Sequence, residues 1–96
     1  MHYRIIFYSP DNVNDSAVSF DSEQPFMNFN KGDFINLSFN DEFNKEKSNL
    51  SSDKDNMIQI AGINHDFVFT KGMMEHVKRI FTKFVPNAEA VKQLYK

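Results

Sequence analysis

The sequence predicts a mainly β fold: a five-stranded antiparallel sheet, curled or closed into a small barrel, with a short C-terminal helix. Three observations support this prediction. Several short segments rich in β-branched and aromatic residues alternate apolar and polar positions, as strands buried on one face do. The parity of the apolar positions shifts at Ala61-Gly62, which is typical of a β-bulge that bends a sheet. Finally, helix-forming residues follow Pro86.

Composition limits what a chain of this size can do. With 96 residues, 41% of them hydrophobic and 11 of them phenylalanine, it has the material for one small domain, residues 1–96, with one core. It has no cysteine, which excludes disulfides, a thiol nucleophile and cysteine-ligated metal centres. The three glycines match neither a P-loop nor a dinucleotide fingerprint, and there is no Gly-x-Ser-x-Gly elbow. We therefore expect no enzymatic activity and no cofactor.

The first half of the chain predicts three strands. Residues 2–9 are dense in β-branched and aromatic types, and residues 17–22 alternate apolar and polar positions. Turn-forming residues separate these two segments, which are therefore expected to pair as a hairpin. Gly32 predicts a turn with positive φ, and residues 33–39 follow it as the third strand.

The second half predicts two more strands, of which the last is ambiguous. Residues 57–69 give the strongest strand signal in the chain, and a turn at residues 71–72 follows. The apolar residues of the next segment fit either a strand over 74–85 or one stripe of a helix over 73–85, so an α+β fold with four strands is the alternative. Six of the nine residues from 77 to 85 are β-branched or aromatic, and no capping residue precedes them, which favours the strand.

The segment 40–56 has the composition of a loop. It holds five acids and three lysines, with only Phe43 and Leu50 as apolar side chains. Such a segment buries too little apolar surface to offset the entropy of ordering it. We expect a flexible polar loop with fast amide exchange and preferential proteolysis.

The last ten residues predict a short helix. Asn87 is a suitable N-cap, helix formers follow it, and Val91, Leu94 and Tyr95 fall on one side. We expect this helix to cover an open end of the sheet.

Three short motifs carry a resemblance. The order Gly32-Asp33-x-Ile35, His65-x-Phe67 and His76-Val77-x-Arg79 is similar to that of short uncharacterised bacterial and phage-associated β-rich proteins. The resemblance covers about residues 32–86. It implies that the Gly-Asp pair opens a strand and that the two histidine-containing segments pair as a hairpin, and it carries no expectation about activity.

Two histidines and one aspartate are the only candidates for metal or acid–base chemistry. In a strand, His65 and Asp66 point to opposite faces, whereas His65 and His76 can approach each other across the hairpin. Because a catalytic zinc usually needs three protein ligands, we expect no metal site and structural roles for both histidines.

Charge is unevenly distributed along the chain. Residues 1–70 carry 5 basic and 11 acidic side chains, whereas residues 71–96 carry 6 basic and 2 acidic ones. Lys78, Arg79 and Lys83 form a basic strip that could contact phosphate or an acidic partner, with Arg79 and Lys83 on one face of a strand. The competing interpretation is a solvated face that balances the acidic remainder, which agrees with a sequence pI of about 5.8.

Phenylalanines in irregular segments are the other candidates for partner binding. Three of them, Phe26, Phe29 and Phe43, lie outside the predicted strands and are expected to be partly exposed and to contact a partner. The alternative for Phe26 and Phe29 is that they plug the open end of a barrel.

These observations together predict a small binding or assembly accessory that acts through protein–protein contacts, with a protein partner or by self-association. The alternative is a weak nucleic-acid-binding small barrel that uses the basic C-terminal segment. The first apolar run is too short for a secretory signal, and no stretch approaches the roughly 18 apolar residues of a membrane helix. We therefore expect a cytoplasmic protein with no membrane contact.

Overall fold

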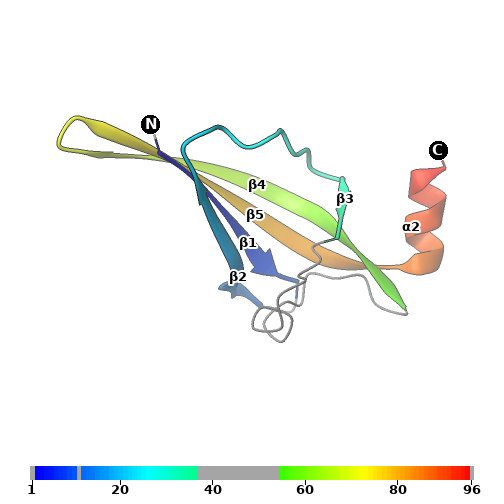
Figure 1. The fold of residues 1–96 in the computed structure, drawn as a ribbon. Helices are drawn as coiled ribbons and strands as arrows, with labels where there is room; N and C mark the ends of the chain where they lie inside the picture. Colours follow the sequence, from blue (N-terminus) through cyan, green and yellow to red (C-terminus); the bar gives the residue numbers. More distant parts are fainter. Residues whose placement is uncertain (1, 11, 37–54, 96) are drawn as a thin grey trace, which may run out of the picture.

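The computed structural model describes residues 2–10, 12–36 and 55–95, which form five strands and one helix (Figure 1). In chain order these are β1 His2–Ser9, β2 Asn12–Ser22, β3 Phe34–Ile35, β4 Asn56–Thr70, β5 Met73–Pro86 and α2 Asn87–Leu94. The mainly β class, the five strands and the short C-terminal helix are confirmed.

The sheet has the strand order β2-β1-β5-β4-β3 and is mixed rather than wholly antiparallel. The pairs β1–β2, β3–β4 and β4–β5 are antiparallel, but β1 and β5 pair parallel, with His2 opposite Glu75 and Phe7 opposite Ile80. The reason is geometric. When five strands alternate in direction, the first and the fifth run the same way, so bringing them side by side produces a parallel pair.

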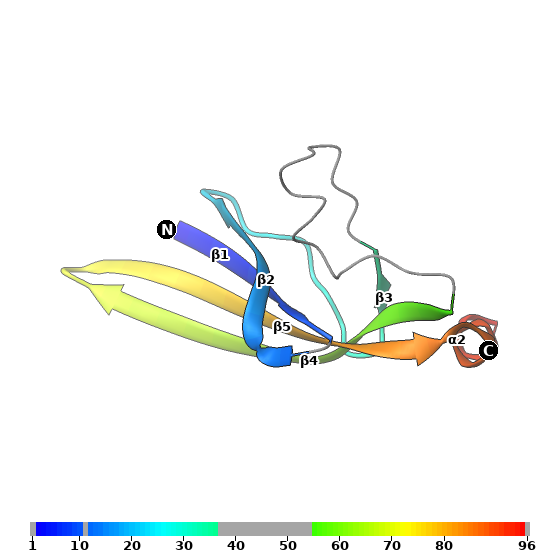
Figure 2. The ribbon, with the colours of Figure 1, turned by 90° about the horizontal axis from the view of Figure 1, so that it is seen from below.

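The sheet curls into a half-barrel that is open between its two edge strands, β2 and β3. The connection between these strands, residues 23–33, runs along one side of the sheet from one edge to the other (Figures 1 and 2). The β4–β5 pairing shifts register between Ile60 and Gly62, where the sequence predicts a bulge. That bulge lets one long hairpin bend within a single sheet.

Residues 73–85 form a strand, so the alternative of a helix there is wrong. β5 occupies the centre of the sheet and pairs with β1 on one side and β4 on the other, which stabilises the β-branched and aromatic residues in extended backbone. The hairpin turns at Lys71 and Gly72, which both have positive φ, 49° and 80°. Positive φ at both central residues is the signature of the hairpin turn whose twist matches that of the strands.

Two strand boundaries differ from those predicted. β2 begins at Asn12, five residues earlier than expected, because pairing with β1 outweighs the turn preference of the Asn and Asp residues there. Register irregularities on either side of Tyr8 accommodate this extension. β3 consists of Phe34 and Ile35, so Asp33 and Asn36 of the predicted strand lie beside it and not in it, and residues 37–39 lie outside the described part of the chain. Gly32 has the positive φ, 96°, that the predicted turn requires.

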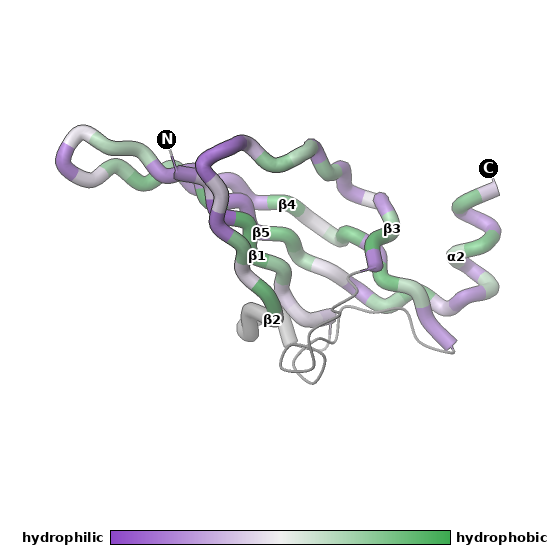
Figure 3. The backbone as a smooth tube through the Cα atoms, viewed as in Figure 1, coloured by the Kyte–Doolittle hydropathy of each residue, from purple (hydrophilic) through white to green (hydrophobic). Residues whose placement is uncertain are grey.

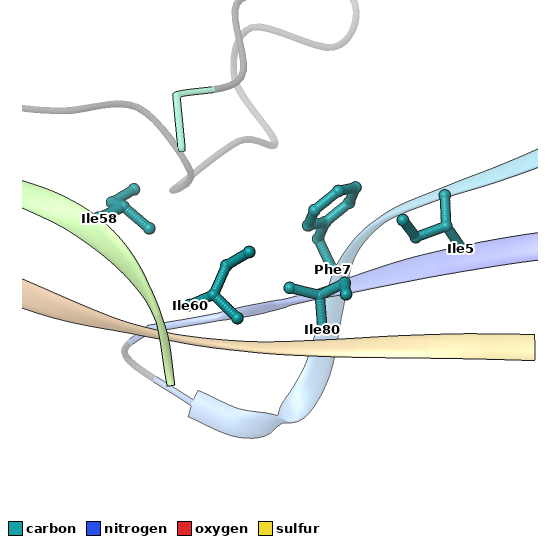
Figure 4. Close-up of a cluster of buried hydrophobic side chains, with 5 residues drawn as sticks. All are labelled: Ile5, Phe7, Ile58, Ile60 and Ile80. Carbon is teal, nitrogen blue, oxygen red and sulfur yellow. The ribbon is translucent and has the colours of Figure 1, made fainter. Parts of the chain in front are cut away.

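One face of the sheet carries the core, and we call it the inner face. Its buried cluster consists of Ile5, Phe7, Ile58, Ile60 and Ile80, whose side chains lie together on one side of the strands (Figure 4). Hydrophobic and hydrophilic stretches are interspersed along these strands (Figure 3). The other face is called the outer face below.

Helix α2 lies at the end of the sheet opposite the β4–β5 turn (Figure 1). It buries Ala90 and contacts β4 and β5, while Val91, Leu94 and Tyr95 are exposed, so the helix does not pack on the sheet through the stripe that these three residues form. The helix follows Pro86 and has no side-chain cap, although Asn87 was the predicted N-cap. This helix is far too short to cross a membrane, and no described helix could do so.

Of the polar segment 40–56, residues 40–54, with Phe43, lie outside the described part, and Asn56 opens β4. The flexible loop stays a prediction.

Candidate partner-binding surface

The three basic residues of the predicted strip lie on two faces of β5. Lys78 is opposite Ile5 of β1 and belongs to the inner face, where it is buried. Arg79 and Lys83 lie on the outer face, as expected from their spacing. Only Lys83 is exposed, because Arg79 is half-buried. The structure therefore does not bring the three cations together on one surface.

Arg79 is held by neighbours on the outer face. Its Nε donates a hydrogen bond of 2.7 Å to Oδ2 of Asp66, and its Nη1 donates one of 2.8 Å to the hydroxyl of Tyr8. The hydrogen bond from Arg79 holds the pKa of Asp66 below its usual value. The Tyr8 ring also stacks on Phe81, with 4.8 Å between ring centroids. These contacts satisfy the guanidinium within the fold rather than presenting it to phosphate.

A second ion pair links β1 to the edge strand β2. Nε of Arg4 donates a hydrogen bond of 2.7 Å to Asp21, and His2 lies 3.1 Å from the same carboxylate oxygen. The hydrogen bond from Arg4 lowers the pKa of Asp21. Both groups are solvent-exposed, so their pairing orients β1 and β2 more than it stabilises them.

Phe26 and Phe29 pack on the core from the segment 23–33 that spans the open side of the half-barrel. Both are half-buried, and the Phe29 ring meets Phe7 edge-on at 6.0 Å. This arrangement favours the interpretation in which they plug an opening.

His65 and His76 approach each other on the inner face, as expected across the hairpin. Nδ1 of His65 and Nε2 of His76 are 2.9 Å apart, so one ring donates a hydrogen bond to the other. His76 also stacks on Phe67, with 4.6 Å between centroids. Desolvation lowers the pKa of His76, and the charges of His65 and Lys78 add to this effect. Within the described ranges no three His, Cys, Asp or Glu residues lie close enough together to hold a metal ion.

Several exposed apolar side chains of the described strands lie near the turn of the β4–β5 hairpin. We call residues 67–74 the ribbon tip, which lies at one end of the molecule (Figure 1). In the described part of the chain β1 pairs with β5 from Glu75 onward, so residues 69–74 form a two-stranded ribbon, whereas Phe67 and Val68 lie opposite residues of β5 that still pair with β1. Phe67 is 54% exposed, Phe69 72% and Met73 73%. Exposed large side chains grouped in this way are typical of an interaction surface.

The ribbon tip is apolar on both faces and lies beside a free strand edge. Phe67 and Phe69 are on the inner face, whereas Val68 and Met73 are on the outer face. Within the described part of the chain, no strand pairs with the outer edge of β4 from Gly62 to the turn, because β3 pairs only at the other end. Such an edge presents unpaired backbone groups to another strand.

Sequence reasoning missed the ribbon tip because alternation along a strand indicates which face Phe67 and Phe69 share, but not where the neighbouring strand ends. The signal that could have found it is Phe67-Val68-Phe69, which is apolar on both faces of a strand next to a tight turn. A strand that is apolar on both faces is either covered on both sides or available to a partner.

Comparison of the chain with protein-family models, with curated proteins and with solved structures found no match.

Proposed function

We propose that this chain is a binding or assembly accessory that acts through protein–protein contacts, and that the ribbon tip is its contact surface. The observation that carries the proposal is the exposure of Phe69 and Met73 past the described end of β1, with Phe67 exposed beside them. Burying one large apolar side chain contributes about 1.5–3 kcal/mol. A few such side chains at the centre of an interface supply most of the energy of a specific contact.

The partner that best fits the ribbon tip is a second copy of this chain. Among the described strands none pairs with the outer edge of β4 from Gly62 to Thr70, and this edge carries one acidic side chain, Asp66, which already pairs with Arg79. Two such edges can therefore meet antiparallel without strong like-charge repulsion. Antiparallel pairing of identical edges obeys two-fold symmetry, and a register centred on Val68 would place Phe67 of each copy opposite Phe69 of the other.

The nucleic-acid alternative has less support. Lys78 is buried on the inner face, and Arg79 is bound to Asp66 and Tyr8 on the outer face. Lys83 is thus the one exposed cation of the three that a nucleic-acid backbone can reach, and a single phosphate contact gives weak binding with only a small salt dependence.

Sedimentation velocity over a concentration series tests the proposal. The wild-type chain should shift from monomer to dimer as its concentration rises. The double variant Phe69→Ser/Met73→Ser should stay monomeric and folded, because both side chains project into solvent in the monomer. Met27→Ser is the matched control, since Met27 is as exposed as Met73 but lies in the segment 23–33, and it should associate like wild type.

Three results would contradict the proposal. A wild-type chain that stays monomeric throughout removes the second copy as partner, and a double variant that associates normally removes the ribbon tip. Loss of association in Leu94→Ser, with the double variant unaffected, would place the contact on helix α2 instead. Salt-dependent binding of single-stranded or duplex oligonucleotides at two salt concentrations would favour the nucleic-acid alternative.

A further inference from the structure

A pocket of about 150 Å³ lies between the inner face of the sheet and the segment 23–33. The sheet contributes His65, His76 and Lys78 to its lining, and the segment contributes Pro25, Phe26 and Asn28. No carboxylate is among the described residues that line it. The pocket therefore combines nitrogen-bearing side chains with apolar walls and has no negative charge of its own.

Lys78 is the unusual member of this lining. Only 8% of the residue is exposed, yet within the described ranges its ammonium makes no hydrogen bond or ion pair. Nζ of Lys78 lies over the face of the Phe29 ring, 5.8 Å from its centroid, in a cation–π contact. Among the described residues no fully buried side-chain nitrogen lacks a hydrogen-bond partner, so the stem of Lys78 is buried while its ammonium keeps some contact with solvent. A cation at the pocket without an acidic partner is suited to an anion from outside the chain.

The two histidines place further hydrogen-bonding groups beside Lys78. His65 is directly opposite Lys78 in the β4–β5 pairing, and His76 is two residues before it on the same face of β5. Their mutual hydrogen bond uses Nδ1 of His65 and Nε2 of His76, which leaves one nitrogen of each ring for another partner. Arg4 also lines the pocket, but its guanidinium is bound to Asp21.

We propose that this pocket binds a small oxyanion, a phosphate or carboxylate group, with Lys78 as the charged contact and the imidazoles of His65 and His76 as hydrogen-bonding contacts. Phosphate and carboxylate share the chemistry that the site recognises, which is a compact negative charge with several acceptor oxygens. The amide of Asn28 can contact the same group from the opposite wall. This site is separate from the exposed side chains of Phe69 and Met73, which do not line the pocket.

Titration followed by NMR tests this site with inorganic phosphate and acetate as separate probes. Sodium chloride at matched ionic strength is the reference, because it screens charge without offering an oxyanion. Phosphate or acetate should shift the imidazole resonances of His65 and His76 and the backbone amide of Lys78 in a saturable way. Phosphate binding alone or acetate binding alone identifies which oxyanion the pocket takes.

Variants of two lysines on the same strand provide the control. Lys78→Met keeps an unbranched stem but removes the charge, and it should weaken binding at least tenfold. Lys83→Met removes an exposed charge from the outer face and should leave the affinity within twofold of wild type. Lys78→Arg retains the charge and provides a second test if Lys78→Met does not fold. In this variant the oxyanion should still shift the imidazole resonances of His65 and His76.

The proposal is overturned if neither phosphate nor acetate shifts these resonances beyond the chloride reference. It is also overturned if Lys78→Met binds as tightly as wild type, or if Lys83→Met weakens binding as much as Lys78→Met does.

Discussion

Replacing Ile80 with alanine should destabilise the fold more than almost any other single truncation. Ile80 is fully buried on the central strand, opposite Phe7 of β1 and Ile63 of β4. Truncation to alanine removes three carbon atoms from a site with packed strands on both sides, where little collapse can fill the cavity. Such changes cost 2–5 kcal/mol, and we expect about 3 kcal/mol here.

That loss is a large fraction of the stability of a small domain, which is about 5–14 kcal/mol for a chain of this length. With a urea m-value of about 1.5 kcal/mol/M, the midpoint of unfolding should fall by about 2 M. Circular dichroism is the suitable signal, because the chain has no tryptophan.

Two further variants show how the loss of stability should depend on burial and on the size of the truncation. Ile80→Val should cost only about 1 kcal/mol. Leu94→Ala, at an exposed helical position, should change stability by less than about 0.5 kcal/mol. A loss below about 1 kcal/mol for Ile80→Ala, or a larger loss for Leu94→Ala, would refute the packing described for β5.

Two other outcomes test the turn and the outer face. Gly72→Ala should destabilise the fold by about 1 kcal/mol in thermal unfolding, because φ is positive at this residue although nothing crowds the new methyl group. Gly62→Ala is the matched control, since Gly62 also has open space around it but no positive φ. Equal effects of the two variants would contradict the turn geometry. Since the pKa of Asp66 is lowered in the folded state, its contribution is present above its ordinary pKa, near 3.8, and is lost as the pH falls through the lowered value. Asp66→Asn should therefore reduce the acid dependence of stability, measured by urea unfolding at several pH values, and an unchanged dependence would show that Arg79 does not stabilise this carboxylate.

Local chemistry was enough to predict most of the strands. β-branched and aromatic composition identified residues 74–85 as a strand against a competing helical periodicity over 73–85, and the parity shift located the bulge near Gly62. The turn at Lys71 and Gly72 could be placed because few residues tolerate positive φ.

The features that the sequence did not predict depend on which strands become neighbours. The parallel β1–β5 pair and the crossing of the segment 23–33 are decided by tertiary packing, not by local propensity. The exposure of Phe69 likewise depends on where β1 stops pairing with β5. By contrast, the separation of Lys78 from Arg79 follows from alternation along a strand, so sequence reasoning could have kept them on different surfaces.

The parallel contact between the first and last strands has a consequence for how the chain acquires its structure. It joins residues about 70 positions apart, so closing it costs far more chain entropy than forming the β4–β5 hairpin, whose strands meet at a two-residue turn. Local pairing is therefore expected to come first, with β4 and β5 forming a template on which β1 docks. During synthesis from the N-terminus, the β1–β2 hairpin must wait for β5 to leave the ribosome before it gains its permanent neighbour. In that interval the apolar side chains of Ile5 and Phe7 have no sheet to cover them, and this is when the nascent chain is most exposed to aggregation and to chaperones.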